Sequence, residues 1–254
     1  MFKKGVLLIV LLGILLPFLL MGLLSVSKGW FYPDIFPKSF TLGHWQLLLH
    51  QESELQQSLL LSLLMALGVA SVATLLGFWV SKELAYAKQR NTWLLLAYWP
   101  FVLSPVVLAI LLQRFFIYAG LSVSFIGVSL GQLLLAFPYT VILFQSFWSN
   151  YILELYQQSV TLGASTVQVF RQILLPIAAP ILLICFFQTF LISWFEYGLT
   201  QLIGVGKIKT LTILVFKYVN EANIFHAALA SLLLMLPPCL LLWLNKRFVF
   251  SKLV

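Results

Sequence analysis

Few residues of this sequence combine the type and the spacing that chemistry requires, and Glu196 is the most conspicuous of them. It is the one carboxylate inside a long apolar run, and the string Glu196-Tyr-Gly-Leu-Thr continues from it through Tyr197 to Thr200. Ionisable groups within apolar spans usually face a cavity or a partner, which predicts a role at a pathway or gate. A second interpretation stays open. Because ~20 helical residues beyond Pro176 rise roughly 30 Å, Glu196 could instead reach an interface and form a structural ion pair.

Other reactive groups lack partners at a useful spacing. The pattern GxxxxGK[ST], which cradles nucleotide phosphates, does not occur in the sequence, so the chain is not predicted to hydrolyse ATP in the P-loop manner. Two cysteines, Cys185 and Cys239, lie singly inside apolar runs and predict neither a disulfide nor a metal site. One segment gathers histidines and carboxylates at spacings that do not support a metal centre, namely His44, His50, Glu52 and Glu54. We therefore expect no enzyme activity, metal or cofactor.

The composition identifies the environment of these residues. Hydrophobic residues make up 62% of the 254 and charged residues only 9%, and the mean hydropathy is +1.04. A soluble domain carries about 25% charged residues, so we interpret this chain as an integral membrane protein. The formal net charge of +8 forms no basic stripe. Lysines beside membrane spans explain it without nucleic acid.

Six apolar runs are long enough to cross a bilayer, since ~30 Å of hydrocarbon requires about 20 apolar residues in a helix. They cover approximately residues 5–27, 56–80, 93–117, 126–147, 177–202 and 225–244. Their continuous, leucine-rich character argues against a β-barrel, whose strands are short and alternating. The predicted fold class is all-α integral membrane with six transmembrane helices.

An even number of spans places both termini on one side of the membrane. Basic residues directly flank the outermost spans, with Lys3 and Lys4 at the beginning and Lys246 and Arg247 at the end. Segments on that side also carry more Lys and Arg in total than those on the other side. By the positive-inside rule, both termini are predicted to be cytoplasmic.

The inner segment at about 148–175, between the fourth and fifth spans, has helical signals of its own. Gly163 separates two short helical patterns, where glycine allows a sharp bend with positive φ. Ser165 and Gln168 have the spacing of a capping box, and Pro176 suits the first turn of the fifth span. The pattern predicts a helix–turn–helix knob. It would either cap the inner end of the bundle or dock another protein.

Residues recur at helical spacing in each half of this knob. Leu155, Ser159 and Leu162 recur at helical spacing before the glycine. After it, a second set falls on one helical face at i, i+3 and i+7, namely Val167, Phe170 and Leu174. The knob is therefore expected to be mildly amphipathic.

The residue order in this segment adds a family resemblance. The string Gln157-Gln-Ser-Val-Thr-Leu-Gly-Ala-Ser, followed by Phe170 and Leu175-Pro176, resembles the EAA motif of binding-protein-dependent ABC importer permeases. That motif runs Glu-Ala-Ala, three residues, a fixed glycine and, further on, I/L-x-L-P. Gly163 and Leu175-Pro176 match it in spacing. Its commonest flanks are matched by Leu162, Ala164 and Ser165.

The chain departs from the motif where Gln157, Gln158 and Ser159 replace Glu-Ala-Ala. This leaves no carboxylate for an ion pair with an ATPase, so docking is expected to depend on shape and neutral hydrogen bonds. Elsewhere, Gly-Phe-Trp-Val in the second span and Pro105-Val-Val in the third are similar to the family. Glu196-Tyr-Gly-Leu-Thr is similar to the E-F-G-x-T string of permeases for small ions and cationic metabolites. The resemblance extends over about residues 55–248.

The resemblance implies the MetI-like fold of type I importers. It implies a first helix with an external loop (1–54) and a five-helix core (55–254) in a bacterial inner membrane. The implied partners are ABC ATPase subunits, a second permease chain, an external solute-binding protein and the lipid bilayer. The implied ATPase-coupling residues are Gln157, Gln158, Ser159, Leu162, Gly163, Ala164, Ser165, Phe170, Leu175 and Pro176. The pathway candidates are Glu196, Tyr197 and Thr200.

Several alternatives stay open at this point. A secondary transporter would usually show an inverted repeat, which is not visible in the sequence, and a membrane scaffold could also use an inner knob. Family members with similar strings move polyamines, thiamine, ferric iron, sulfate or molybdate. This favours a small charged solute without naming it. The second permease chain could be identical or homologous.

Overall fold

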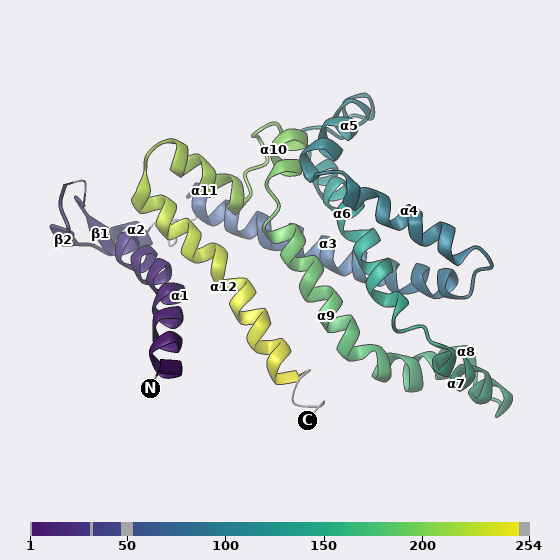
Figure 1. The fold of residues 1–254 in the computed structure, drawn as a ribbon. Helices are drawn as coiled ribbons and strands as arrows, with labels where there is room; N and C mark the ends of the chain where they lie inside the picture. Colours follow the sequence, from purple (N-terminus) through teal and green to yellow (C-terminus); the bar gives the residue numbers. More distant parts are fainter. Residues whose placement is uncertain (1, 31–32, 47–52, 249–254) are drawn as a thin grey trace. The chain divides into compact units, whose positions relative to one another are not determined.

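The computed structural model describes the chain except for residues 1, 31–32, 47–52 and 249–254. Helices form most of the described part (Figure 1). The chain divides into two compact units. Unit one comprises Met1–Ser62 and Lys209–Cys239, and unit two comprises Leu63–Ile208 and Leu240–Val254. Two long helices, α3 (Glu54–Ala85) and α12 (Ile224–Phe248), begin in unit one and end in unit two.

Unit one contains the N-terminal helix and a small antiparallel hairpin. Its other elements are α1 (Phe2–Val26), β1 (Ser27–Lys28), β2 (Ser39–Phe40), α2 (Gly43–Gln46) and α11 (Leu211–Asn220). Ser27 lies opposite Phe40 in the hairpin. The Thr41 backbone N–H donates to the Val26 carbonyl at 2.7 Å, so the chain returns to the end of α1.

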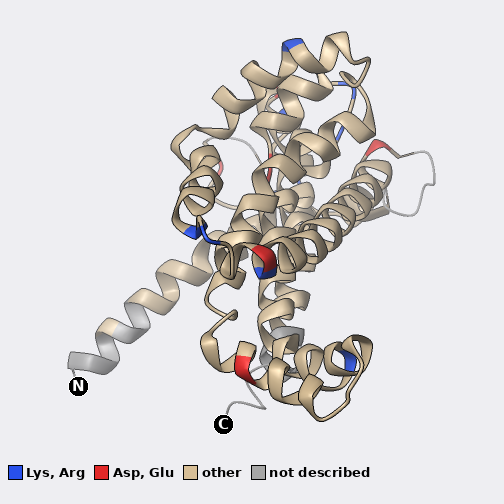
Figure 2. Ribbon diagram, turned by 90° about the vertical axis from the view of Figure 1, so that its right-hand side faces the viewer, with Lys and Arg blue, Asp and Glu red and all other residues tan. Residues whose placement is uncertain are grey.

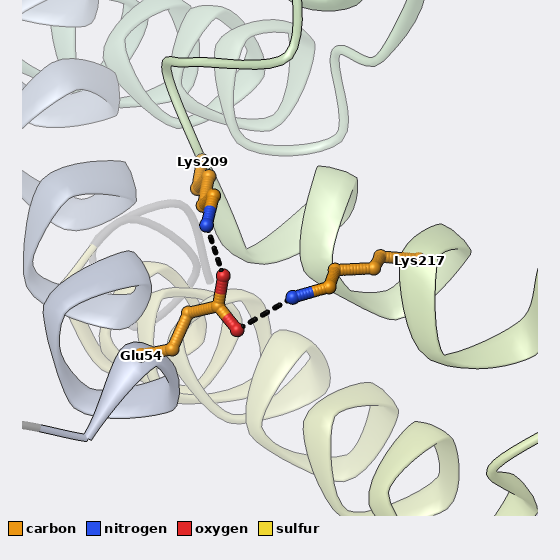
Figure 3. A network of polar contacts seen from close by, with 3 residues as sticks. All are labelled: Glu54, Lys209 and Lys217. Carbon is orange, nitrogen blue, oxygen red and sulfur yellow. Dashed lines mark hydrogen bonds and ion pairs between the residues drawn. The ribbon is translucent and has the colours of Figure 1, made fainter. Parts of the chain in front are cut away.

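The first turns of α3 are fastened to α11 within unit one. Figure 3 shows the Glu54 carboxylate between two ammonium groups, with Lys209 Nζ at 2.5 Å and Lys217 Nζ at 2.7 Å. The backbone N–H of Leu211 donates to Ser62 Oγ at 2.6 Å. Hydrogen bonding to the Glu54 carboxylate raises the pKa of the Lys217 ammonium above its usual value. All these groups lie at the beginning of α3 or around α11, and we call Glu54, Lys209 and Lys217 the ion cluster.

Unit two is the larger helical bundle. In chain order it contains the rest of α3, then α4 (Arg90–Val102), α5 (Pro105–Tyr118), α6 (Phe125–Gln145), α7 (Asn150–Thr161), α8 (Thr166–Val169), the π-helical turn η1 (Phe170–Leu174), α9 (Leu175–Trp194) and α10 (Gly198–Gly204). Helices α3 and α6 approach closely at Gly77, where an added Cβ would lie 1.8 Å from Thr140 Oγ1. The Thr140 hydroxyl also donates to the Ala73 carbonyl at 3.0 Å. The lack of a side chain at Gly77 thus permits the close packing of α3 and α6.

The third predicted span is broken rather than continuous. Helices α4 and α5 meet at an angle of 98°. Ser104 is extended and its side chain accepts a hydrogen bond from the Val107 N–H, which caps α5. Pro105 explains the break, because the residue before proline is pushed out of the helical region and proline favours the first helical position. The span predicted over 93–117 therefore consists of two helices joined by a sharp bend.

Four helices of the described chain are long and apolar enough to cross a membrane, or five if the bent α4–α5 pair counts as one span. They include the second, fourth, fifth and sixth predicted spans, and Figure 2 shows how little charge the ribbon carries. In α1, Val10–Val26 forms a shorter apolar helix. The predicted orientation depends on Lys3, Lys4, Lys246 and Arg247, whose side chains lie outside the described part. The six-span count and the orientation thus stay predictions.

Candidate functional site

The predicted helix–turn–helix is present, and we call residues 150–174 the knob. Helix α7 ends at a tight turn, where the Gly163 N–H donates to the Val160 carbonyl at 2.9 Å. Gly163 has φ +87°, as its bend was predicted to require. At the start of α8, Ser165 N–H donates to Gln168 Oε1 at 2.8 Å and Gln168 N–H donates to Ser165 Oγ at 3.3 Å. The capping box is confirmed.

The second half of the knob is continuous with the fifth span instead of being separated from it. Residues Thr166–Trp194 form one 29-residue helical stretch. It passes through η1, where the Leu175 N–H reaches back to the Phe170 carbonyl in a π-type bond. Pro176 follows at once and lacks an N–H. A π turn often accommodates such a local disruption, and it joins the knob to α9 without a loop.

One face of α7 is exposed. It borders a groove of about 490 Å³. The groove is lined by Glu154, Gln157, Gln158, Thr161 and Leu162, which follow one another at helical i, i+3 and i+4 spacing. Leu162, at the turn, is 88% exposed. We call these five residues the outward face, and it holds three of the predicted coupling residues.

The opposite face of α7 is buried. Ile152 and Ser159 are almost inaccessible to solvent, and the Ser159 hydroxyl donates to the Leu155 carbonyl at 2.7 Å. Ser159 therefore does not share the outward face with Gln157 and Gln158. Leu162, which recurs at helical spacing after Ser159, is exposed instead of buried. It lies beyond the last turn of α7 as the residue that caps it, so the helical period no longer fixes its direction.

In the second half, Val167, Phe170 and Leu174 were predicted to share one helical face, and they do not. Val167 is 65% exposed, whereas Val169 and Leu174 are buried. Phe170 is turned toward α3, where its ring stacks on Trp79 at a centroid distance of 5.2 Å. The π turn shifts the periodicity after Val169, because each π turn holds more residues than an α turn.

Polar contacts join the knob and its approach to the end of α3. The Trp148 indole N–H donates to Ser81 Oγ at 2.8 Å, and Gln145 Nε2 donates to the Ser81 carbonyl at 3.1 Å. Lys82 lies over the Tyr156 ring, with its ammonium 5.3 Å from the centroid. We call these five residues the α3 joint.

Aromatic rings surround the α3 joint. Phe78 contacts Phe144, Phe147, Trp148 and Phe170 at centroid distances of 5.0–6.4 Å. Phe78, Phe144 and Trp148 are at most 5% exposed. The knob is thus held against α3 and α6 by a packed interface as well as by its own continuation into α9.

Glu196 lies in a break between α9 and α10, not within the fifth span as predicted. Its side chain is 7% exposed. The carboxylate accepts hydrogen bonds from the Leu199 N–H at 2.6 Å, the Thr200 N–H at 2.8 Å and the Thr200 hydroxyl at 2.7 Å. Free N–H groups at a helix start favour a carboxylate at this position, so Glu196 caps α10.

The cap extends into a buried network. Gln132 Nε2 on α6 donates to Thr200 Oγ1 at 3.0 Å, and Ser193 Oγ donates to Gln132 Oε1 at 2.5 Å. Within the described residues, the ion pairs are Asp34–Lys38 and those of the ion cluster. The ion-pair interpretation of Glu196 therefore finds no basic partner in that part of the chain. Tyr197 occupies the position before α10.

The possible metal ligands do not form a centre in the described chain. Among its residues, no group of three or more His, Cys, Asp or Glu side chains could hold a metal ion. Glu54 is engaged by two lysines, while His44 lies against the Phe225 and His226 rings. His50 and Glu52 lie outside the described residues.

Comparisons with known proteins agree with this architecture. A family profile described as "Binding-protein-dependent transport system inner membrane component" matches residues 69–250. A solved structure described as inward-facing conformations of the MetNI methionine ABC transporter has a similar fold. The TM-score is 0.56 at 18% sequence identity, over 79% of this chain and 99% of that one. No curated protein matches the chain.

The apolar helices and the shared fold define an all-helical integral membrane protein with a MetI-like fold. Because the matching profile covers well over half of the sequence, the chain belongs to the family of binding-protein-dependent transport system inner membrane components. Members of this family are the permease components of ABC transporters and not enzymes themselves.

Three residues of the site were not singled out by the sequence. Glu154 precedes Gln157 by one helical turn, so the spacing alone could have placed both on one face. Gln132 is a lone amide in an apolar run, a signal for a buried polar contact. Ser81 offers no such signal, because its partners come from a helix that is distant in the sequence.

Proposed function

We propose that this chain is the permease subunit of an ATP-driven importer, and that its knob docks on a separate ATPase subunit. The observation that carries the proposal is the two-sided structure of α7. One face is buried against the α3 joint, whereas the other is exposed and ends in Leu162, which is 88% exposed. A cap for the bundle would need only the buried face. An exposed apolar residue beside polar side chains suits a protein contact.

The proposed mechanism assigns a role to each part of the chain. ATP binding closes a pair of ATPase subunits, and each subunit moves the knob that it holds. The π turn and the α3 joint pass this movement to α9 and α3. Two permease chains surround the pathway, as we infer from the likeness to a methionine ABC transporter. An external binding protein delivers the solute, for which we propose a small charged molecule. The bacterial inner membrane is the proposed location.

The coupling residues contribute in different ways in this proposal. On the exposed side, the contact is formed by Gln157, Gln158, Leu162, Gly163 and Ser165. Ser159 and Phe170 instead lie on the side of the knob that faces the rest of unit two. Ala164 closes the turn through its N–H, which donates to the Ser159 carbonyl at 3.1 Å. Leu175 and Pro176 set the junction with α9.

For the pathway, we propose that Glu196, Tyr197 and Thr200 act by positioning α10. Both oxygens of the Glu196 carboxylate already accept hydrogen bonds from the start of α10. A solute ligand would need a free acceptor. The capped helix packs against α5 and α6 in unit two, since Gly198 contacts Val106 and Gly131 lies beneath Ile203. A shift of α10 would therefore change the shape of the bundle at this end.

The docking proposal is tested by Gly163→Asp with Gly120→Asp as the matched control. Both glycines have positive φ and open space around the missing Cβ, so the two variants carry a similar backbone strain. Gly163→Asp is expected to reduce the ATPase subunit recovered with the purified permease about tenfold, equivalent to ~1.4 kcal/mol of binding free energy. Gly120→Asp is expected to retain it. Equal recovery in both variants would exclude docking at the knob.

The same preparation separates the proposal from a secondary transporter or a scaffold. An importer's ATPase activity should rise when the external binding protein and its solute are added to the complex. A secondary transporter would move solute without the ATPase. A scaffold would bind its partner without any response to the binding protein.

A further inference from the structure

The outward face contains a carboxylate where the sequence motif has none. Glu154 lines the groove together with Gln157 and Gln158. It is exposed, and within the described residues it takes part in no hydrogen bond or ion pair. The replacement of Glu-Ala-Ala by Gln-Gln-Ser therefore does not leave the knob without an acid. The acid lies one helical turn earlier on the same face.

The groove surrounds this carboxylate with neutral acceptors and an apolar edge. Within the described part of the chain, the Gln157 and Gln158 side-chain amides form no hydrogen bond, while the Thr161 hydroxyl donates to the Gln157 carbonyl at 2.9 Å. Leu162 closes one end. The open space over this face measures about 490 Å³, enough for a long side chain of a partner to lie on it.

The charge in the groove is negative. Arg171, the other charged residue of the knob, lies on η1 and does not line the groove. A partner that fills the groove would desolvate the Glu154 carboxylate, and a buried unpaired charge is costly. The partner must therefore supply a cation at this point. A guanidinium fits well, because it donates several hydrogen bonds in a plane.

We propose that Glu154 receives a basic side chain of the ATPase subunit, with the amide oxygens of Gln157 and Gln158 accepting its remaining hydrogen bonds. Leu162 enters an apolar pocket beside it. This inference rests on the proposed docking function and adds the chemistry of the partner. It replaces the expectation that docking depends only on shape and neutral hydrogen bonds. Charge-assisted hydrogen bonds are stronger than neutral ones, and their contribution falls with salt when the pair is partly exposed.

The test compares Glu154→Gln with Glu83→Gln. Glu83 is also exposed, but it lines a separate groove between α3, α4 and α6. The full chain is placed in lipid nanodiscs, and the dissociation constant of the purified, co-expressed ATPase subunit is measured at low and high salt. Wild-type binding is expected to weaken with salt. Glu154→Gln is expected to weaken binding at least about tenfold at low salt and to flatten the salt dependence. Glu83→Gln is expected to follow wild type.

The conservative variant Glu154→Asp guards against a folding defect. It keeps the charge, so it is expected to keep most of the salt dependence even if binding weakens. If Glu154→Gln binds like wild type at low salt, or keeps the same salt slope, the ion pair does not exist. Failure of the docking proposal itself looks different, since wild type would then not bind the ATPase subunit at any salt concentration.

Discussion

The hydrogen bonds of the Glu196 side chain connect it to the start of α10. Its carboxylate accepts three hydrogen bonds from Leu199 and Thr200 and has no basic partner within the described residues. Two of the donors are backbone N–H groups at the start of α10, which would otherwise be unsatisfied in a buried position. The charge is thus compensated by oriented dipoles, and the role of the residue is to fix the helix.

The first residue-scale prediction follows from this geometry. Glu196→Gln replaces one carboxylate oxygen by an NH₂ group, which faces donors and cannot accept from them. We expect a loss of about 1–3 kcal/mol, the cost of leaving a buried polar group unsatisfied. A thermal unfolding scan in detergent should show a transition several degrees lower. Glu221→Gln, at an exposed position, should leave it unchanged. Equal transitions in both variants would show that the cap does not stabilise α10.

Gly77 provides a second prediction at this scale. A methyl group there would approach Thr140 Oγ1 to 1.8 Å and its Cβ to 2.5 Å, so α3 and α6 would have to separate. Overpacking of this kind costs about 1–3 kcal/mol. Gly77→Ala should therefore lower the unfolding temperature. Gly68→Ala on the same helix, with nothing within 4 Å, should have little effect or a small gain from helix propensity. If Gly68→Ala lowered the unfolding temperature more than Gly77→Ala, the close packing of α3 against α6 would be contradicted.

At the scale of elements, the α3 joint suggests that the knob moves together with the end of α3. Trp148 donates a hydrogen bond to the Ser81 hydroxyl, and Gln145 donates one to the Ser81 carbonyl. These contacts come from the chain just before α7, and Lys82 adds a contact with Tyr156 inside it. A single contact would let the knob rotate about it, whereas contacts just before α7 and within it oppose that rotation.

Trp148→Phe tests this by removing the indole donor while keeping an aromatic ring. A lost buried hydrogen bond costs about 1 kcal/mol, so backbone amides of α7 should exchange with deuterium roughly fivefold faster. Trp99→Phe, at a 65% exposed position on α4, is the matched control and should leave the exchange of α7 unchanged. If Trp148→Phe also leaves it unchanged, the indole hydrogen bond does not hold the knob in place.

The same elements show which features the sequence could predict. The turn at Gly163 and the capping box of Ser165 and Gln168 depend on neighbouring residues, and both are present. The break before Pro105 is also local, but a window that averages hydropathy conceals it. The cap formed by Glu196 could not be predicted, because it requires α9 to end at Trp194 within a run that stays apolar. Tertiary packing decides that boundary, and no periodicity reports it.

At the scale of the whole molecule, α3 is one of the two helices that belong to both units. It begins at the ion cluster and ends beside Ser81 and Lys82, at the α3 joint. No proline interrupts it, whereas α1, α4, α6, α9 and α12 each contain at least one within the helix. The 27 residues between Glu54 and Ser81 correspond to roughly 40 Å of helix.

This separation leads to a prediction about independence. Glu54→Gln would leave Lys209 and Lys217 without their carboxylate, but all three side chains are partly exposed, and such pairs contribute only about 0–1 kcal/mol. Effects at sites that share no partner are normally additive within about 0.5 kcal/mol. The double variant Glu54→Gln/Glu154→Gln should therefore bind the ATPase subunit as weakly as Glu154→Gln alone, with a slightly lower unfolding temperature. A further loss of binding in the double variant would reveal coupling along α3 between the ion cluster and the knob. An uninterrupted helix fixed to its neighbours at both ends is the element through which such coupling would have to pass.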